Sequence, residues 1–234
     1  MPWRPLRRPD RSSTSTVVRC WSDVAWLAGA SVVLVLSALP VDADHISTVE
    51  RVTFRIVNDP TVLPFVIVWP VMQLGNILVL AVAAVVALMA RRLRLAASIV
   101  LGGVAAYALA KVVKRIVERG RPDTLLDDVN IRGEASLGLG YVSGHAAVIA
   151  LIAMVTVPYL PRRWRWIPWV VLALVGWARI YVGAHLPLDV VGGAALGLAV
   201  GAAVRLLLGR PGPCPSRAAA PEPLPERASD QISD

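Results

Sequence analysis

The residues best able to do chemistry fall into three short clusters, each near the end of an apolar stretch. Together they hold three cations, two histidines, one carboxylate and a Ser-Gly pair: Lys114 and Arg121, then Ser143, Gly144 and His145, then Arg179, His185 and Asp189. Ionisable side chains at membrane depth are costly, so they usually face a cavity and take part in function. Three cations favour a bound anion, and histidines with a carboxylate can move protons or attack an electrophile. The clusters therefore predict phosphate chemistry at a membrane surface.

The composition of the chain indicates a membrane protein. Of its 234 residues 56% are hydrophobic and its mean hydropathy is +0.61, whereas soluble proteins are about 45–50% apolar. The net charge is +8, but most arginines sit in short clusters between apolar runs, as topology signals do. This placement argues against a nucleic-acid partner. Cys20 and Cys214 lie near opposite ends of the chain and predict neither a disulfide framework nor a metal site.

Six apolar stretches predict membrane-spanning helices, since one crossing needs about 20 mostly apolar residues. They run over about 21–41, within 62–90, and over about 95–117, 145–160, 166–182 and 188–208. Pro64 and Pro70 predict that the second is bent or interfacial at its start. We therefore expect an all-α integral membrane bundle of six transmembrane helices within residues 21–209. A basic cytoplasmic segment at 1–20 precedes it, and a disordered, Pro-rich cytoplasmic tail at 210–234 follows.

Clusters of arginine set the expected orientation of this bundle. They precede the first helix, separate the second from the third and the fourth from the fifth, and close the sixth: Arg4, Arg7, Arg8, Arg11, Arg19, Arg91, Arg92, Arg94, Arg162, Arg163, Arg165, Arg205 and Arg210. With six crossings these clusters share one side, which the positive-inside rule makes cytoplasmic together with both termini. The chemical residues then lie on the extracytoplasmic side. Lys114 and Arg121 break the charge rule there, and a bound anion would explain them.

Lys114 and Arg121 can meet at one anion. Arg121 precedes Pro122, which disfavours a helical conformation at Arg121, so this side chain should lie off the third helix and fold back. A lysine acts as a point charge, and the planar arginine fork matches phosphate oxygens. Taken alone, such a pair can equally extend to lipid headgroups. We interpret Lys111, Arg115 and Arg119 in that second way, as headgroup anchors.

Ser143, Gly144 and His145 stand where a loop becomes the fourth helix. The free N–H groups and positive end of a helix form a ready anion site, and glycine permits close approach. Ser143 alone could serve as an N-cap. His145 is notable because the chain has three histidines and two of them, His145 and His185, fall in these clusters. The third, His45, lies in a predicted loop.

Arg179, His185 and Asp189 surround the start of the sixth helix, where Pro187 fits the first turn. Asp189 follows His185 by four residues, so its carboxylate can accept a hydrogen bond from one ring nitrogen and leave the other free to attack. Asp189 could also simply complement the helix dipole, but that interpretation leaves Arg179 and His185 unexplained.

Nine of these positions, in order, resemble the signature of the type 2 phosphatidic acid phosphatase superfamily. The patterns are Lys-x6-Arg-Pro, Ser-Gly-His and Arg-x5-His-x3-Asp, and the similarity covers about residues 100–201. That superfamily includes membrane lipid phosphatases, soluble acid phosphatases and vanadium haloperoxidases. This chain departs from the usual pattern at Val142, where the family has proline, and at Ala178, where it has serine. Val142 loosens a turn but removes no reacting group, whereas Ala178 removes a possible hydrogen-bonding hydroxyl, so the two changes bear on rate and substrate preference more than on reaction class.

The resemblance implies a role for each site residue. His185 is the nucleophile, Asp189 orients it, and His145 is the general acid and then the base. Lys114, Arg121 and Arg179 hold the phosphate with Ser143 and the Gly144 N–H. Because phosphoryl transfer mainly needs positioning and charge neutralisation, three fixed cations suffice, and we expect no metal and no cofactor.

The sequence therefore predicts a lipid phosphatase of the cell membrane, with its site on the extracytoplasmic side and the bilayer as its environment. The expected substrates are amphiphilic phosphates such as undecaprenyl diphosphate, phosphatidic acid or phosphatidylglycerophosphate. Two alternatives stay open, a lipid phosphotransferase with the same site and a non-catalytic protein that binds lipid phosphates. The oligomeric state is not predicted.

Overall fold

The computed structural model describes residues 17–133 and 138–212, and the fold is mostly helical. The helices and strands, in chain order, are β1 (Val17–Val18), α1 (Trp21–Ala38), α2 (Thr48–Asn58), α3 (Phe65–Gln73), α4 (Ile77–Met89), α5 (Leu93–Val117), α6 (Pro122–Leu125), α7 (Gly144–Thr156), the 3-10 turns η1 (Val157–Tyr159) and η2 (Arg162–Trp164), α8 (Ile167–Tyr181), α9 (Pro187–Leu208) and β2 (Arg210–Pro211). The strands form one short antiparallel pair. Most of the predicted tail, 213–234, lies outside the described residues.

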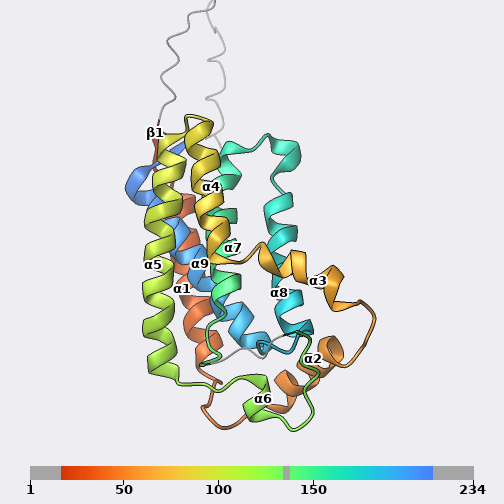
Figure 1. Cartoon of the computed structure of the whole chain (residues 1–234). Coiled ribbons are helices and arrows are strands. Elements are labelled where there is room, and N and C mark those ends of the chain that lie inside the picture. Colours follow the sequence, from red (N-terminus) through yellow and green to blue (C-terminus); the bar gives the residue numbers. More distant parts are fainter. Residues whose placement is uncertain (1–16, 134–137, 213–234) are drawn as a thin grey trace, which may run out of the picture.

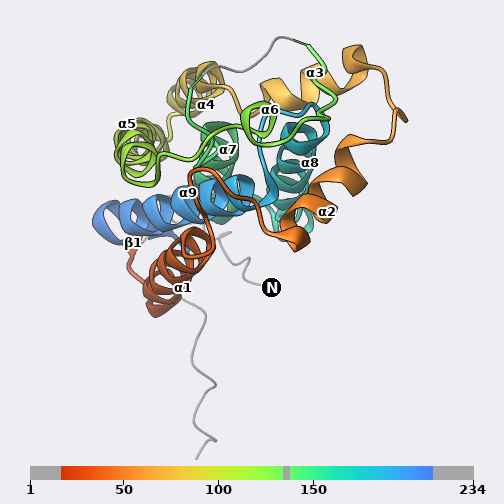
Figure 2. The same ribbon diagram turned by 90° about the horizontal axis from the view of Figure 1, so that it is seen from below.

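The long helices run roughly side by side, and α9 lies among α1, α5, α7 and α8 (Figures 1 and 2). Within the described part of the chain, three helices are long and apolar enough to cross a membrane: α1, Leu93–Leu125 and α9. The pair α3 and α4 adds a fourth candidate, bent by 52°, as the prolines of this stretch predicted. The number of six crossings stays a prediction.

Helices α7 and α9 pack with their backbones almost in contact, because glycines of α9 face α7. A Cβ atom at Gly197 would lie 2.1 Å from the carbonyl oxygen of Ala147, and one at Gly193 would lie 2.3 Å from that of Ser143. Real Cβ atoms do not approach so closely, so only glycine fits at either position. Small residues at helix interfaces permit this close packing in membrane proteins. The start of α7 is thereby fixed against the first turns of α9.

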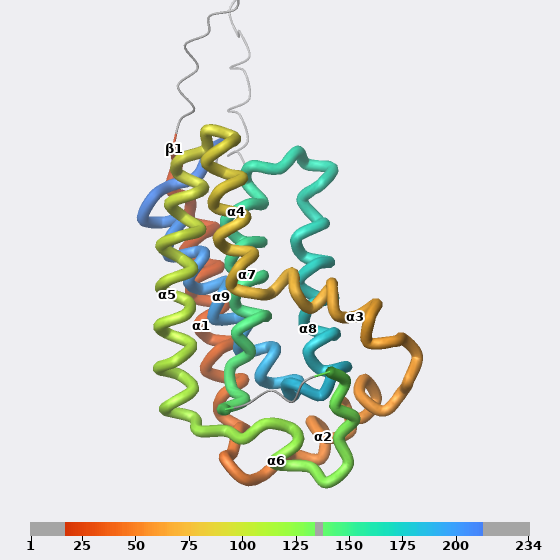
Figure 3. The backbone as a smooth tube through the Cα atoms, viewed as in Figure 1, coloured from red at the N-terminus to blue at the C-terminus, as the bar shows by residue number. Residues whose placement is uncertain are grey.

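The two ends of the bundle differ in the segments that they carry (Figures 1 and 3). The α4–α5 and α7–α8 connections lie at the end that holds β1, and Arg92 there donates a hydrogen bond to the carbonyl of Tyr159. At this end Asp23 of α1 is fully buried and forms an ion pair with Arg205 of α9. The opposite end carries α2 and α6. The arginine clusters between the helices therefore gather at one end, as the sequence predicted.

Two features at the ends of the bundle correct sequence-based interpretations. Cys20 is disulfide-bonded, although the two cysteines had predicted no disulfide framework. The stretch after α1, taken as an outer loop, contains α2, which Ser47 caps by accepting a hydrogen bond from the N–H of Glu50. Helix α2 is amphipathic: Glu50, Phe54 and Asn58 share its buried face, because residues four apart lie on one side of a helix.

Candidate active site

The structure brings the three sequence clusters together from five elements. Lys114 lies in the last turn of α5 and Arg121 precedes α6. Ser143 and His145 stand at the start of α7, Arg179 ends α8, His185 lies in the α8–α9 connection, and Asp189 is in the first turn of α9. The N–H of Ser143 donates a 2.8 Å hydrogen bond to the backbone carbonyl of Asp189, which ties the second cluster to the third.

His185 and Asp189 form the buried centre of this site. Their side chains are 3% and 0% exposed, and Nδ1 of His185 lies 3.4 Å from Oδ2 of Asp189. The same oxygen accepts a 2.9 Å hydrogen bond from the N–H of Leu186. His185 Nδ1 has no hydrogen-bond partner among the described residues, so the contact with Asp189 is a loose pairing. It turns Nδ1 toward the carboxylate and leaves Nε2 as the other ring nitrogen.

The surroundings of His185 are positively charged. Burial lowers its pKa well below the usual value, and the nearby Arg179, Arg121 and Lys114 lower this pKa further, followed by His145. Burial disfavours the charged imidazolium, and cations add repulsion. His185 is therefore neutral at pH 7 and carries a free lone pair.

The three cations are held by neutral groups. Lys114 Nζ donates to the carbonyls of Leu139 (2.6 Å) and Gly140 (3.3 Å). Arg121 donates to the carbonyls of Gly138 (3.0 Å) and Ala184 (2.8 Å). A nitrogen of Arg179 contacts the sulfur of Met72 at 3.0 Å. Among the residues that the structure describes, none of these cations forms an ion pair with a carboxylate. Three unneutralised cations around one histidine favour the binding of an anion.

The N-terminus of α7 completes the anion site. The hydroxyl of Ser143 is buried and has no hydrogen-bond partner among the described residues. A Cβ atom at Gly144 would meet nothing within 4 Å, so open space lies beside the first turn. Helix N-termini direct unpaired N–H groups at such a space. No group of three or more His, Cys, Asp or Glu side chains within the described ranges is placed to hold a metal ion.

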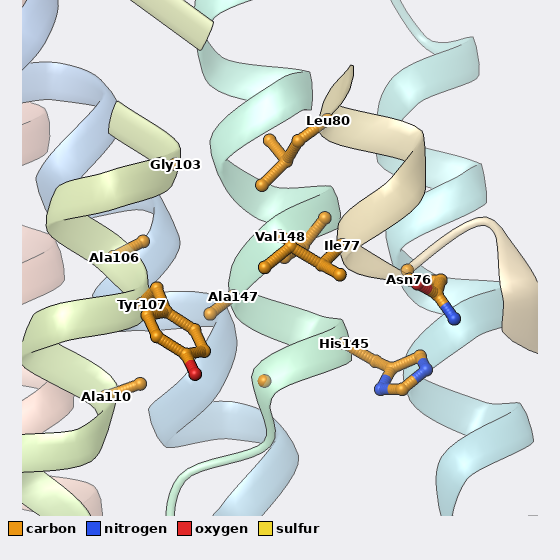
Figure 4. A pocket seen from close by; sticks show the side chains of 12 residues that line it. Asn76, Ile77, Leu80, Gly103, Ala106, Tyr107, Ala110, His145, Ala147 and Val148 are labelled. Carbon is orange, nitrogen blue, oxygen red and sulfur yellow. The ribbon is translucent and has the colours of Figure 1, made fainter. Parts of the chain in front are cut away.

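Two cavities meet at His145. A polar cavity of about 560 Å³ is lined by His145 and Arg179, with Gln73, Asn76 and Arg132 around them. An apolar groove of about 350 Å³ runs between α4, α5 and α7 and also reaches His145. In Figure 4 Ile77, Tyr107 and Val148 line this groove, and His145 lies on the first turn of α7. The site therefore joins a charged space to an apolar one at His145 and Asn76, the two residues that line both.

Glu50 and Arg119 were missed as members of the site by sequence reasoning. Arg119 was interpreted as a headgroup anchor, and that interpretation is wrong, because its side chain is completely buried between Glu50 and Asp189. Burial lowers the pKa of Arg119, but the hydrogen bonds and charges of Glu50 and Asp189 outweigh it, so the pKa is raised overall. The four-residue spacing of Glu50, Phe54 and Asn58 was the available signal for α2.

The sequence matches the model of the PAP2 superfamily over residues 91–212, more than half of the chain. The chain belongs to this superfamily. It is similar to the undecaprenyl-diphosphatase of Sulfolobus acidocaldarius, with 32% identity over 117 residues, 50% of this chain and 56% of that protein. It is also 34% identical over 103 residues to the decaprenylphosphoryl-5-phosphoribose phosphatase of Mycobacterium tuberculosis, 44% of this chain and 55% of that one.

The matched region thus spans about half the length of these curated relatives. Among solved structures, the crystal structure of Aquifex aeolicus LpxE is similar, with a TM-score of 0.63 and 25% identity, and the match covers 70% of this chain and 98% of that one. The relatives carry phosphatase names, and the fold extends the similarity beyond the motif region. Family and fold together identify a membrane protein of the PAP2 type.

Proposed function

We propose that this protein is a lipid phosphatase that removes the phosphate or terminal phosphate from an amphiphilic substrate. The observation that carries the proposal is the junction at His145, which lines both the polar cavity and the apolar groove. A substrate with a charged head and an apolar tail fits both spaces at once. The bond to be broken would then lie at the histidine that can protonate the leaving oxygen.

The proposed mechanism has two steps. Nε2 of neutral His185 attacks the phosphorus, the bond to the leaving oxygen breaks, and His145 gives that oxygen a proton. His145 then takes a proton from water, the water oxygen attacks phosphorus, and the N–P bond breaks to release phosphate. Lys114, Arg121 and Arg179 would neutralise the phosphoryl oxygens throughout, which is the main requirement of phosphoryl transfer. We expect the reaction to proceed without a metal.

Polyprenyl diphosphates and monophosphates are the proposed substrate class. The support is the similarity to two relatives whose names specify undecaprenyl diphosphate and decaprenylphosphoryl-5-phosphoribose, both of which carry a polyprenyl chain. Phosphatidic acid and phosphatidylglycerophosphate are the competing candidates. From the arginine clusters we propose a six-helix protein of the cell membrane with its site on the extracytoplasmic side.

The test is phosphate release in EDTA by the purified full chain in detergent, with undecaprenyl diphosphate, phosphatidic acid and phosphatidylglycerophosphate as substrates. His185→Ala should abolish release. His45→Ala is the matched control, because His45 is exposed in the connection before α2. Folded protein that releases phosphate from none of these lipids would contradict the proposal. Transfer of labelled phosphate to an added alcohol in place of water would identify a phosphotransferase.

A further inference from the structure

A buried ion network contacts His185 through Asp189. It joins Glu50 of α2, Arg119 of the α5–α6 connection and Asp189 of α9, whose residues are 5%, 0% and 0% exposed. A nitrogen of Arg119 lies 3.0 Å from Oδ1 of Asp189. Glu50 Oε1 also accepts a 3.0 Å hydrogen bond from the N–H of Leu188. The network therefore links an outer helix to the turn that carries the site.

The hydrogen bonds divide the oxygens of Asp189 between two tasks. Nη1 of Arg119 donates to Oε1 of Glu50 and to Oδ1 of Asp189, while Nη2 donates to Oε2 of Glu50. Glu50 thus accepts a hydrogen bond from each terminal nitrogen of Arg119, whereas Asp189 accepts one hydrogen bond from that guanidinium. The second oxygen of Asp189, Oδ2, stays with the Leu186 N–H and His185.

We propose that Glu50 and Arg119 are positioning residues that hold Asp189 in the orientation in which Oδ2 faces His185. This inference rests on the proposed function, in which His185 is the nucleophile. Arginine and a carboxylate often pair through two parallel hydrogen bonds. Without the charge of Glu50, Arg119 would be free to bind both oxygens of Asp189 and draw Oδ2 away from the imidazole.

Charge balance supports the same role. One arginine between two carboxylates leaves the network with one net negative charge, which opposes the three cations that also act on His185. That charge favours the positive imidazole that forms when a phosphorus atom is bound to Nε2. Loss of Glu50 would cancel it, because Arg119 would then neutralise Asp189 alone. The network therefore sets both the direction of the carboxylate and the charge that the nucleophile faces.

The test compares Glu50→Gln and Arg119→Lys with two controls, Glu118→Gln and Arg115→Lys, which change exposed residues of the same segment. Gln has the shape of Glu, so Glu50→Gln should fold. With a lipid phosphate that the parent hydrolyses, kcat should fall about 10–100-fold, by analogy with the loss when the partner that orients a metal-bound histidine is removed. KM should change less than about twofold, since neither residue contacts the phosphate. The controls should behave like the parent.

Binding of inorganic vanadate and inorganic phosphate gives a readout that needs no turnover. Vanadate can take a histidine nitrogen as a fifth ligand, whereas phosphate is held by charge alone. Glu50→Gln should therefore weaken vanadate binding about tenfold and leave phosphate binding within about twofold. Equal losses of both anions, or no loss of either, would overturn the inference. A parent that hydrolyses no lipid but shows this selective loss would contradict the proposed function only.

Discussion

Nδ1 of His185 lies 3.4 Å from Oδ2 of Asp189, one helical turn further along the chain, and both side chains are buried. The contact connects a neutral ring to a carboxylate whose other oxygen is already bound by Arg119. Asp189 therefore has one oxygen for the imidazole and one for the rest of the protein. This relationship places Nδ1 beside the carboxylate and leaves Nε2 as the ring nitrogen for the attack that we propose.

Asp189→Asn should lower the rate of phosphoenzyme formation about 10³–10⁴-fold, because an amide can present its N–H group to Nδ1 and select the wrong tautomer of His185. The comparable change in a serine protease triad costs about 10⁴-fold. Rapid-quench trapping of the phosphohistidine would measure the rate. A loss of less than about tenfold would mean that Asp189 does not set the tautomer.

In the pH profile of kcat/KM, the midpoint of the acid limb should lie below pH 6.5. In the proposed mechanism the nucleophile is the neutral imidazole of His185. Burial, Arg179 and Arg121 lower the pKa of this histidine from its usual value of about 6.5. A lowered pKa keeps the ring neutral as the pH falls, so activity should persist into more acidic solution. Arg121→Gln removes one cation and should move the limb toward higher pH. Comparing both proteins on one substrate keeps the ionisation of that substrate constant, and a parent midpoint at or above 6.5 would contradict the assignment.

Lys114→Ala should lower kcat/KM about 10²–10³-fold, the usual loss when one donor to a developing charge is removed. Lys114 Nζ is held by two carbonyls beside the anion site, so the charge is in place before substrate arrives. Arg115→Ala is the matched control, since Arg115 is an exposed cation of the same helix. Steady-state kinetics on both variants would measure the difference. Parent-like activity of Lys114→Ala would remove Lys114 from the phosphate site.

Val148→Phe should discriminate between long and short substrates. Val148 lines the apolar groove and is half-buried, so a larger ring there would fill space that we assign to the lipid tail. We expect kcat/KM to fall about tenfold for a long-chain phosphate, which corresponds to about 1.4 kcal/mol, and to stay unchanged for a short-chain analogue. Val112→Phe, at an exposed position of α5, is the control. An equal loss on both substrates would argue against tail binding in this groove.

The sequence indicated which residues would come together better than it indicated the contacts that hold them in place. His185 and Asp189 are four residues apart, and Pro187 between them marks a helix start, so local geometry alone indicated their contact. The cations and His145 were recognisable because ionisable groups are rare in apolar stretches. Pro64 and Pro70 indicated a bent or interfacial start of the second stretch, and the structure places the break just after them, between Gln73 and Ile77.

The contact of Glu50 with Arg119 was not predictable in the same way. It joins residues 69 positions apart. A single glutamate beside a predicted span belongs to no sequence pattern from which its partner could be predicted. Arg119 also resembled its exposed neighbour Arg115, and burial alone separates them. The carbonyl partners of Lys114 and Arg121 are backbone groups, which every residue has, so side-chain identity gives no signal for them.

The near-contact of α7 with α9 at Gly193 and Gly197 has a consequence for how this protein can change over evolution. His145 starts one of these helices, and His185 immediately precedes the other, so the two histidines belong to one stiff unit. Helix α7 supplies one wall of the apolar groove, and the other two come from α5 and the start of α4, which lie outside that unit. Mutations on those walls can therefore alter which lipids are accepted while the spacing of the histidines is preserved. Substrate range can then evolve independently of reaction chemistry within this fold.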